Sequence, residues 1–169
     1  GCFPPPAKRW SMDFFYPNYT NDMWRIFGLI FFDDKDHFVD IEKKKFCKDN
    51  IEQFLREKAI AVSDTVAVAN RLNGNASDLT LEVVEPLNLA GILDQIPRCH
   101  TLVTTGQKAT DTLLSITGSP APEIGGFVDF LYHNRRLRLY RMPSTSRAYP
   151  KPLTDKAKIY RTIFQNFEQ

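Results

Sequence analysis

The fold class is decided by one stretch in the second half of the chain, TLVTTG at residues 101–106, and by the residues that follow it. Residues 101–105 are predicted to form a buried strand, which ends at Gly106. Apolar residues at helical spacing follow directly: Ala109, Leu113 and Ile116. A buried strand that leads straight into a helix is the basic unit of an α/β fold.

The same alternation continues on both sides of this unit. Upstream, Ala59 to Val62 is a short apolar run, which predicts a buried parallel strand ending at Ser63 and Asp64. Residues 70–80 are predicted as a loop, and 127–132 with 136–141 as a hairpin. Four more helices are predicted: residues 21–32 with Thr20 as N-cap, 47–58, 86–96, and a last helix that Thr154 caps.

This order of elements predicts a three-layer α/β/α fold with a mainly parallel central sheet and helices on both of its faces. In such folds the working loops follow the carboxyl ends of the strands, which here are residues 63–66, 105–107 and 142–150. The chain of 169 residues is expected to form a single domain, residues 1–169.

Composition excludes several classes of protein. Hydrophobic residues make up 43% and charged residues 25%, which is typical of a globular domain and not of a disordered chain. The longest apolar run, residues 26–32, is too short to span a bilayer, so no membrane partner is expected. Three scattered cysteines predict free thiols in a reducing compartment, and we expect a cytoplasmic protein.

Metals and cofactors are not expected. The three histidines have no metal-ligand spacing with the cysteines, and no glycine-rich phosphate loop is present. The net charge of +2 does not by itself predict nucleic-acid binding. Cations do cluster locally, however: Arg135, Arg136, Arg138, Arg141, Arg147 and Lys151. These side chains could bind phosphates, although a solvated strand face explains Arg136 and Arg138 equally well.

Two segments carry a resemblance to a known family. One is GCFP at residues 1–4, followed by Phe15-Tyr16 and by NDMW at 21–24. The other is MPSTS at residues 142–146, between a predicted strand and the last helix. Together they resemble the two signature loops of the uracil-DNA glycosylase superfamily, and most closely its hypoxanthine-DNA glycosylase (deoxyinosine glycosylase) branch. Weaker matches occur in the same order at 60–66 and 103–109.

The resemblance implies a monofunctional DNA glycosylase of base excision repair. Such an enzyme flips a deaminated base, hypoxanthine or uracil, out of DNA and hydrolyses its N-glycosidic bond. Asn21 falls where this branch keeps its catalytic asparagine, which would orient water or bind the leaving base; alternatively, Asn21 only caps a helix. Asp64 would read the base edge or activate water, and its alternative role is to cap the turn after a strand.

The remaining site residues follow from the same resemblance. Five of them would line the base pocket: Phe3, Phe15, Tyr16, Ser63 and Thr105. Five others would hold the DNA backbone: Ser144, Thr145, Ser146, Arg147 and Lys151. Core packing is the alternative role of the aromatic residues. Either Arg147 or Tyr149 would wedge into the duplex, because the branch's usual Pro-Ala-Asn is replaced at 147–149 by Arg-Ala-Tyr.

Two other classes of function remain open at this point. A protein of the same fold could bind DNA without cutting the glycosidic bond, or it could hydrolyse free nucleosides or nucleotides. DNA is the expected partner, and no obligate protein partner is evident. Because the chain opens on the GCFP motif itself, we expect it to be shortened at its N-terminus or its sheet to be built differently.

Overall fold

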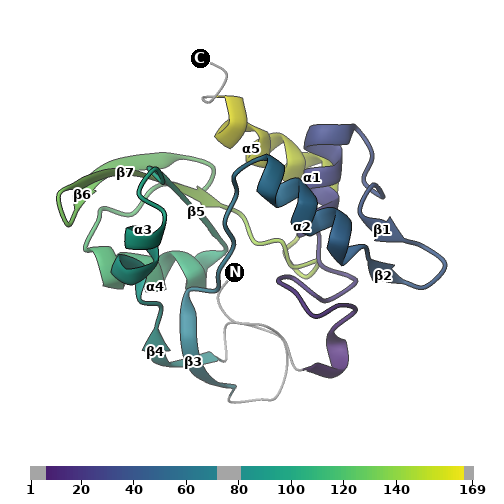
Figure 1. Ribbon diagram of the computed structural model, residues 1–169, viewed down its shortest axis with the longest axis horizontal. Helices are drawn as coiled ribbons and strands as arrows, with labels where there is room; N and C mark the ends of the chain where they lie inside the picture. Colours follow the sequence, from purple (N-terminus) through teal and green to yellow (C-terminus); the bar gives the residue numbers. More distant parts are fainter. Residues whose placement is uncertain (1–6, 72–80, 166–169) are drawn as a thin grey trace. The chain divides into compact units, whose positions relative to one another are not determined.

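The computed structural model describes residues 7–71 and 81–165, and the chain divides into two compact units (Figure 1). We call residues 64–144 the sheet unit, and residues 7–63 with 145–165 the helical unit. Within the described residues, no helix is long and apolar enough to cross a membrane.

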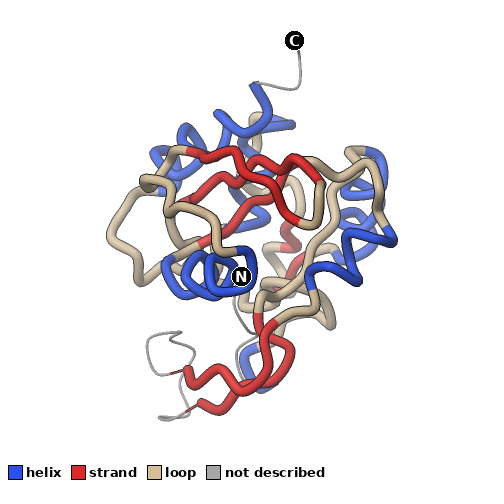
Figure 2. The backbone as a smooth tube through the Cα atoms, turned by 90° about the vertical axis from the view of Figure 1, so that its left-hand side faces the viewer, coloured by secondary structure: helices blue, strands red, loops and turns tan. Residues whose placement is uncertain are grey.

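The sheet unit is built on three hydrogen-bonded strands in the order β5-β7-β6. Figure 2 draws the strands in red. β5 (Thr101–Thr105) runs parallel to β7 (Arg135–Met142), and β6 (Phe127–Tyr132) runs antiparallel to β7. His133 and Asn134 join β6 to β7 with φ angles of 48° and 63°, as a tight two-residue hairpin turn requires. The strand and the hairpin predicted from the sequence are confirmed.

Two helices of the sheet unit pack on one face of this sheet. They are α3 (Leu89–Gln95) and α4 (Gln107–Thr117), both predicted from their spacing. The buried core between helices and sheet is aliphatic: Leu89, Leu93, Leu113, Leu137 and Leu139. The alternate residues of the strands point to the other face, where Phe127 and Leu131 are 46% and 69% exposed.

The remaining strands form two small antiparallel pairs. β3 (Val66–Arg71) pairs with β4 (Leu81–Pro86) in the sheet unit, and β1 (Val39–Asp40) pairs with β2 (Lys45–Phe46) in the helical unit. Residues 70 and 71 of the predicted loop 70–80 instead belong to β3, and residues 72–80 lie outside the described residues. Within the described residues only β5 and β7 are parallel, so the fold is mixed α/β with a small mixed sheet.

The helical unit is held together by aromatic side chains. Its helices are α1 (Met23–Phe32), α2 (Lys48–Glu57) and α5 (Leu153–Gln165), and a short 3-10 helix, η1, covers Ala7–Arg9. Phe27 of α1 contacts the rings of α2 and α5 at centroid distances of 5.8 Å and 6.1 Å. The spacing of apolar residues in the sequence predicted all three α-helices.

The predicted strand at 59–62 is wrong. The structure uses its first half to end α2: Ala59 has a φ of 55°, its N–H donates to Arg56 O (3.2 Å), and Ile60 N–H donates to Leu55 O (2.9 Å). This double hydrogen bond is the usual left-handed ending of a helix. An apolar run cannot become a strand while its backbone closes the preceding helix.

Both predicted helix caps also differ from the structure. Thr20 is exposed, and its hydroxyl donates to Asn18 Oδ1 (3.0 Å) and not to the helix. The N-cap position of α1 is Asp22, whose side chain makes no capping hydrogen bond, and Asn21 Oδ1 accepts the N–H of Met23 (2.9 Å), the first residue of the helix. Thr154 lies inside the first turn of α5, which begins one residue earlier.

Candidate functional site

The predicted site residues divide between the two units. The sheet unit holds three of them: Asp64, Thr105 and Ser144. The helical unit holds eight: Phe15, Tyr16, Asn21, Ser63, Thr145, Ser146, Arg147 and Lys151. Phe3 lies outside the described residues. Asn21 and Asp64, the two predicted catalytic residues, therefore belong to different units.

Asn21 is half-buried at the start of α1. Its backbone N–H donates to Asn18 O (2.8 Å), and its side-chain oxygen accepts the N–H of Met23 as described above. Asn21 thus lies one residue before the N-cap of α1, and its oxygen binds the first N–H of the helix. The side-chain nitrogen makes no hydrogen bond to another described residue, so the group that Asn21 can offer to a ligand is an N–H donor.

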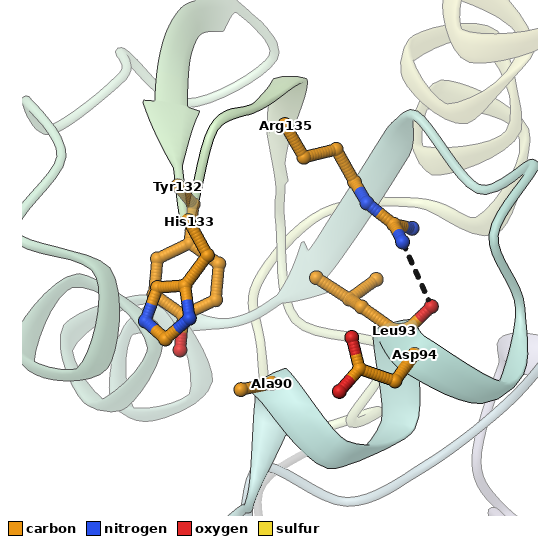
Figure 3. Close-up of a pocket in the computed structure, with 6 residues that line it drawn as sticks. All are labelled: Ala90, Leu93, Asp94, Tyr132, His133 and Arg135. Atoms are coloured by element: carbon orange, nitrogen blue, oxygen red, sulfur yellow. Dashed lines mark hydrogen bonds between the residues drawn. The ribbon is translucent and has the colours of Figure 1, made fainter.

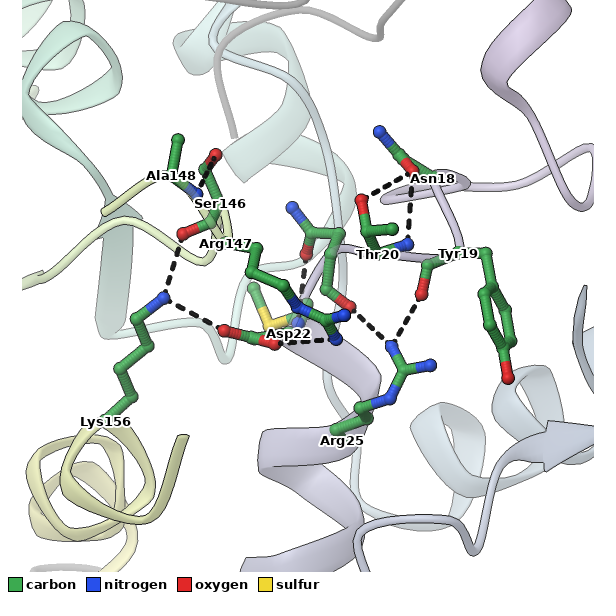
Figure 4. Close-up of polar contacts among 11 residues, drawn as sticks. Asn18, Tyr19, Thr20, Asp22, Arg25, Ser146, Arg147, Ala148 and Lys156 are labelled. Carbon is green, nitrogen blue, oxygen red and sulfur yellow. Dashed lines mark hydrogen bonds and ion pairs between the residues drawn. The ribbon is translucent and has the colours of Figure 1, made fainter. Parts of the chain in front are cut away.

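Arg25 fixes the backbone around Asn21, and Figure 4 draws its hydrogen bonds to this segment. Its guanidinium donates to Tyr19 O (2.6 Å) and to Asn21 O (3.0 Å), and it lies over the rings of Tyr19 and Phe46 at 4.8 Å and 5.1 Å. Only 7% of Arg25 is exposed. A planar cation that is buried between two rings and two carbonyls holds the segment in one conformation.

Asp22, the next residue, joins this segment to the loop before α5 (Figure 4). Its backbone N–H donates to Thr145 O (2.9 Å), and its carboxylate accepts from Lys156 Nζ (3.0 Å) and from Arg147 at 3.5 Å. Lys156 also donates to Ser146 O (2.9 Å). The two segments that the sequence singled out, around Asn21 and at 145–147, are therefore in direct contact within the helical unit.

Sequence reasoning missed Asp22, Arg25 and Lys156. One signal was present for Lys156: it lies four residues before Tyr160, on the helix face that is otherwise apolar. A charged residue in such a position is buried and must be paired. Burial also raises the pKa of Tyr160 well above its usual value.

Phe15 and Tyr16 pack against the core of the helical unit. The ring of Tyr16 meets Trp24 edge-on at a centroid distance of 6.0 Å, and Trp24 Nε1 donates to Phe15 O (3.0 Å). Trp24 itself is fully buried. Core packing thus explains part of the burial of Phe15 and Tyr16, which both remain half-buried.

In the sheet unit, the loops after β5 and β7 meet as predicted. Gly106 N–H donates to Met142 O (3.0 Å), and a Cβ on Gly106 would lie 3.5 Å from the Cβ of Ser144. The φ of Gly106 is 90°, a conformation that favours glycine. Thr105, which precedes Gly106, is 8% exposed. The loops 105–107 and 142–144 therefore form one edge of the sheet.

Asp64 does not end a strand, because residues 59–62 form none; it lies in the loop before β3. Its side chain is half-buried, and burial raises the pKa of its carboxyl group. Ser63 before it is exposed, and Thr65 after it is 8% exposed. The Thr65 hydroxyl has no hydrogen-bond partner among the described residues.

Half of the predicted cation cluster is engaged inside the sheet unit. Arg138 pairs with Asp129 through two hydrogen bonds of 2.8 Å and 3.1 Å, and Arg141 donates to Pro122 O (3.3 Å). Arg135 donates to three carbonyls at the end of α3: Leu93 O, Ile96 O and Cys99 O. The contacts of these three arginines lie within the sheet unit, which reduces the number of cations that could contact phosphates.

A small hollow lies beside Arg135 (Figure 3). Its volume is about 60 Å³, and it is lined by Ala90, Leu93, Asp94, Tyr132, His133 and Arg135. None of these residues was predicted to bind a base. Nor does the described part of the chain contain a group of three or more metal-ligating side chains.

Comparison with protein-family models, curated proteins and solved structures finds no match to this chain.

Proposed function

We propose that the chain is a monofunctional DNA glycosylase that hydrolyses the N-glycosidic bond of a deaminated base, hypoxanthine or uracil, in flipped-out DNA. The proposal includes the three-layer α/β/α fold of the uracil-DNA glycosylase superfamily, which the sequence motifs resemble. It rests on the resemblance of the sequence motifs and on the geometry of the helical unit.

One observation carries the proposal. The segment that contains Asn21 and the loop 145–147, which lie at opposite ends of the chain, are joined by the hydrogen bond from Asp22 N–H to Thr145 O (2.9 Å). A base-contacting amide and a backbone-holding loop must lie together in an enzyme that flips a nucleotide. Direct contact between the two is therefore the arrangement that the proposed activity needs.

The geometry favours one role for Asn21. Breaking the bond leaves negative charge on the departing base, and fixed N–H donors stabilise such charge. Because Oδ1 already accepts the N–H of Met23, the amide would donate from Nδ2 to the base. Asp64, whose pKa is raised by burial, would activate water or accept a hydrogen bond from an N–H of the base edge.

The loop after β7 would hold the DNA backbone. Ser146 and Arg147 are both exposed, and hydroxyl groups and arginine are common phosphate ligands. In the proposed reaction, Asn21 would supply a donor, Asp64 would act as a proton acceptor, and the loop side chains would contact phosphates. A hydrolytic reaction needs no further cofactor.

The test is a cleavage assay on single-stranded and duplex oligonucleotides that each carry one uracil, hypoxanthine or xanthine, with alkali to break abasic sites. The deciding variant is Asn21→Asp, which keeps an oxygen that can accept the N–H of Met23 but loses the N–H donor. We expect its single-turnover rate to fall about 100-fold or more, as it does when an oxyanion donor is removed.

Asn50→Asp is the matched control, because Asn50 is exposed on α2 and its substitution changes the charge by the same amount. It should retain the wild-type rate. Abasic product from the wild type and from the control, but not from Asn21→Asp, supports the proposal. If no substrate yields abasic product although the protein binds DNA at low salt, the proposal is wrong and a DNA-binding module remains.

A further inference from the structure

Lys156 is a buried cation that the proposed chemistry does not use. It lies in the first turns of α5 and has no exposed surface. A lysine ammonium loses its water on burial, which is costly unless charged or polar partners replace that water. The partners of Lys156 therefore indicate why a cation is kept at this position.

Its two hydrogen-bond partners come from different segments. Nζ donates to the Asp22 carboxylate at 3.0 Å and to the Ser146 carbonyl at 2.9 Å. The ring of Tyr149 lies 5.7 Å from the same nitrogen, within range of a cation–π contact. One ammonium group thus connects the residue after Asn21 to the loop that would hold DNA (Figure 4).

The connection runs in parallel with a backbone contact. Asp22 N–H donates to Thr145 O, one residue before the carbonyl that Lys156 binds. Arg147 also approaches Asp22, but at 3.5 Å and with 57% of its side chain exposed. Solvent weakens such an exposed pair, so the buried Lys156 is the stronger of the two ionic links.

We propose that Lys156 is a positioning residue: it fixes the Asn21 segment relative to the loop 145–147, so that the amide donor and the DNA-holding loop keep one mutual geometry. The effect of Lys156 on the reaction rate rests on the proposed function. Its structural part, the link between the two segments, can be tested without any activity. A misplacement of about 1 Å costs about 100-fold in rate when a reaction depends on orientation.

The experiment compares Lys156→Gln with Lys158→Gln in the full chain. Lys158 is exposed on the same helix, so it provides the same change of charge without the buried contacts. The first measurement is hydrogen exchange of the Asp22 amide by NMR, with the Ile51 amide in α2 as reference. The second is the single-turnover rate of base release at saturating DNA, together with the Kd for DNA.

We expect Lys156→Gln to speed exchange of the Asp22 amide by about tenfold or more while the Ile51 amide is unchanged. The single-turnover rate should fall about 100-fold with the Kd for DNA unaltered, and Lys156→Arg should restore part of the rate. If exchange at Asp22 equals that in Lys158→Gln, the link does not exist and the inference is wrong.

A double variant, Asp22→Asn with Lys156→Gln, covers the case in which the single variant does not fold. It leaves two neutral amides and no unpaired buried charge. If the double variant is as stable as the wild type but releases the base slowly, the positioning role is supported. If its rate returns to the wild-type value together with its stability, the positioning role is wrong. If the wild type itself releases no base, the proposed function fails, and the exchange measurement still decides whether Lys156 links the two segments.

Discussion

The two units each contain an ion pair, and the pairs differ in where they lie. In the sheet unit, Arg138 and Asp129 form two short hydrogen bonds, but their side chains are 36% and 50% exposed. In the helical unit, Lys156 and Asp22 form one hydrogen bond of 3.0 Å, and their side chains are 0% and 7% exposed. The exposed pair has the better geometry, and the buried pair has the larger energetic consequence.

The reason is solvation. Water screens an exposed pair and can replace either partner, so its loss changes stability little. A buried charge that loses its partner has nothing to replace it. The Arg138–Asp129 pair therefore lies on an exposed strand face and adds little to stability. The Lys156–Asp22 pair, in contrast, constrains how the segments of the helical unit pack together.

The largest expected effect comes from breaking the buried pair. Asp22→Ala leaves the ammonium of Lys156 buried without a carboxylate, and we expect it to lower the free energy of unfolding by about 3–5 kcal/mol. Urea denaturation followed by circular dichroism measures the change. A loss no greater than that of the exposed control Asp49→Ala would contradict the comparison.

A buried polar group without a partner should respond in the opposite direction. Thr65→Val replaces a hydroxyl that has no hydrogen bond to the described residues by a methyl group of similar shape. We expect a gain of about 1 kcal/mol in the free energy of unfolding. The midpoint in urea should rise at unchanged slope; a lower midpoint would mean that the hydroxyl has a partner in solution.

Asp64 tests burial by its pH dependence. Because burial raises its pKa above the usual 3.8, the folded protein holds this proton more tightly than the unfolded chain. Stability therefore falls as the pH rises from about 3.8 through the raised pKa. Asp64→Asn should stabilise the protein at pH 7 and have no such effect below pH 3.8. An equal effect at both pH values would contradict this assignment.

The smallest effect is expected at the exposed pair. The hydrogen bond from Arg138 lowers the pKa of Asp129, so the pair contributes above pH 3.8 and its contribution is lost as the pH falls through the lowered pKa. Asp129→Asn should shift the thermal midpoint at pH 7 far less than Asp22→Ala does. Salt of 1 M should reduce that small shift further, because the pair is screened.

Most individual elements could be predicted from the sequence. The helices at 21–32, 47–58 and 86–96, the strand at 101–105 and the hairpin at 127–141 are confirmed within a few residues. Each is encoded by apolar spacing or turn residues within a short window, and such signals are local. The run 59–62 failed because its role depends on how α2 ends, which no spacing of four apolar residues reveals.

The candidate site was predictable only in part. The motifs pointed to Asn21 and to the loop 142–147, and the structure joins Asp22, the residue after Asn21, to Thr145 in that loop. The structure also shows that Arg135 donates a hydrogen bond to Leu93 O at the end of α3. Its sequence position beside a hairpin turn did not suggest this contact. Both facts depend on contacts between residues far apart in the chain.

The sequence by itself therefore determined the type and order of most helices and strands, because propensity and periodicity act between near neighbours. Only the tertiary structure decided which charges are buried and what they hold. Lys156 is one of many lysines in the sequence until folding places it 3.0 Å from Asp22 and removes water from both. Burial changes the energy of a charge far more than its residue type does, and burial is a property of the assembled chain.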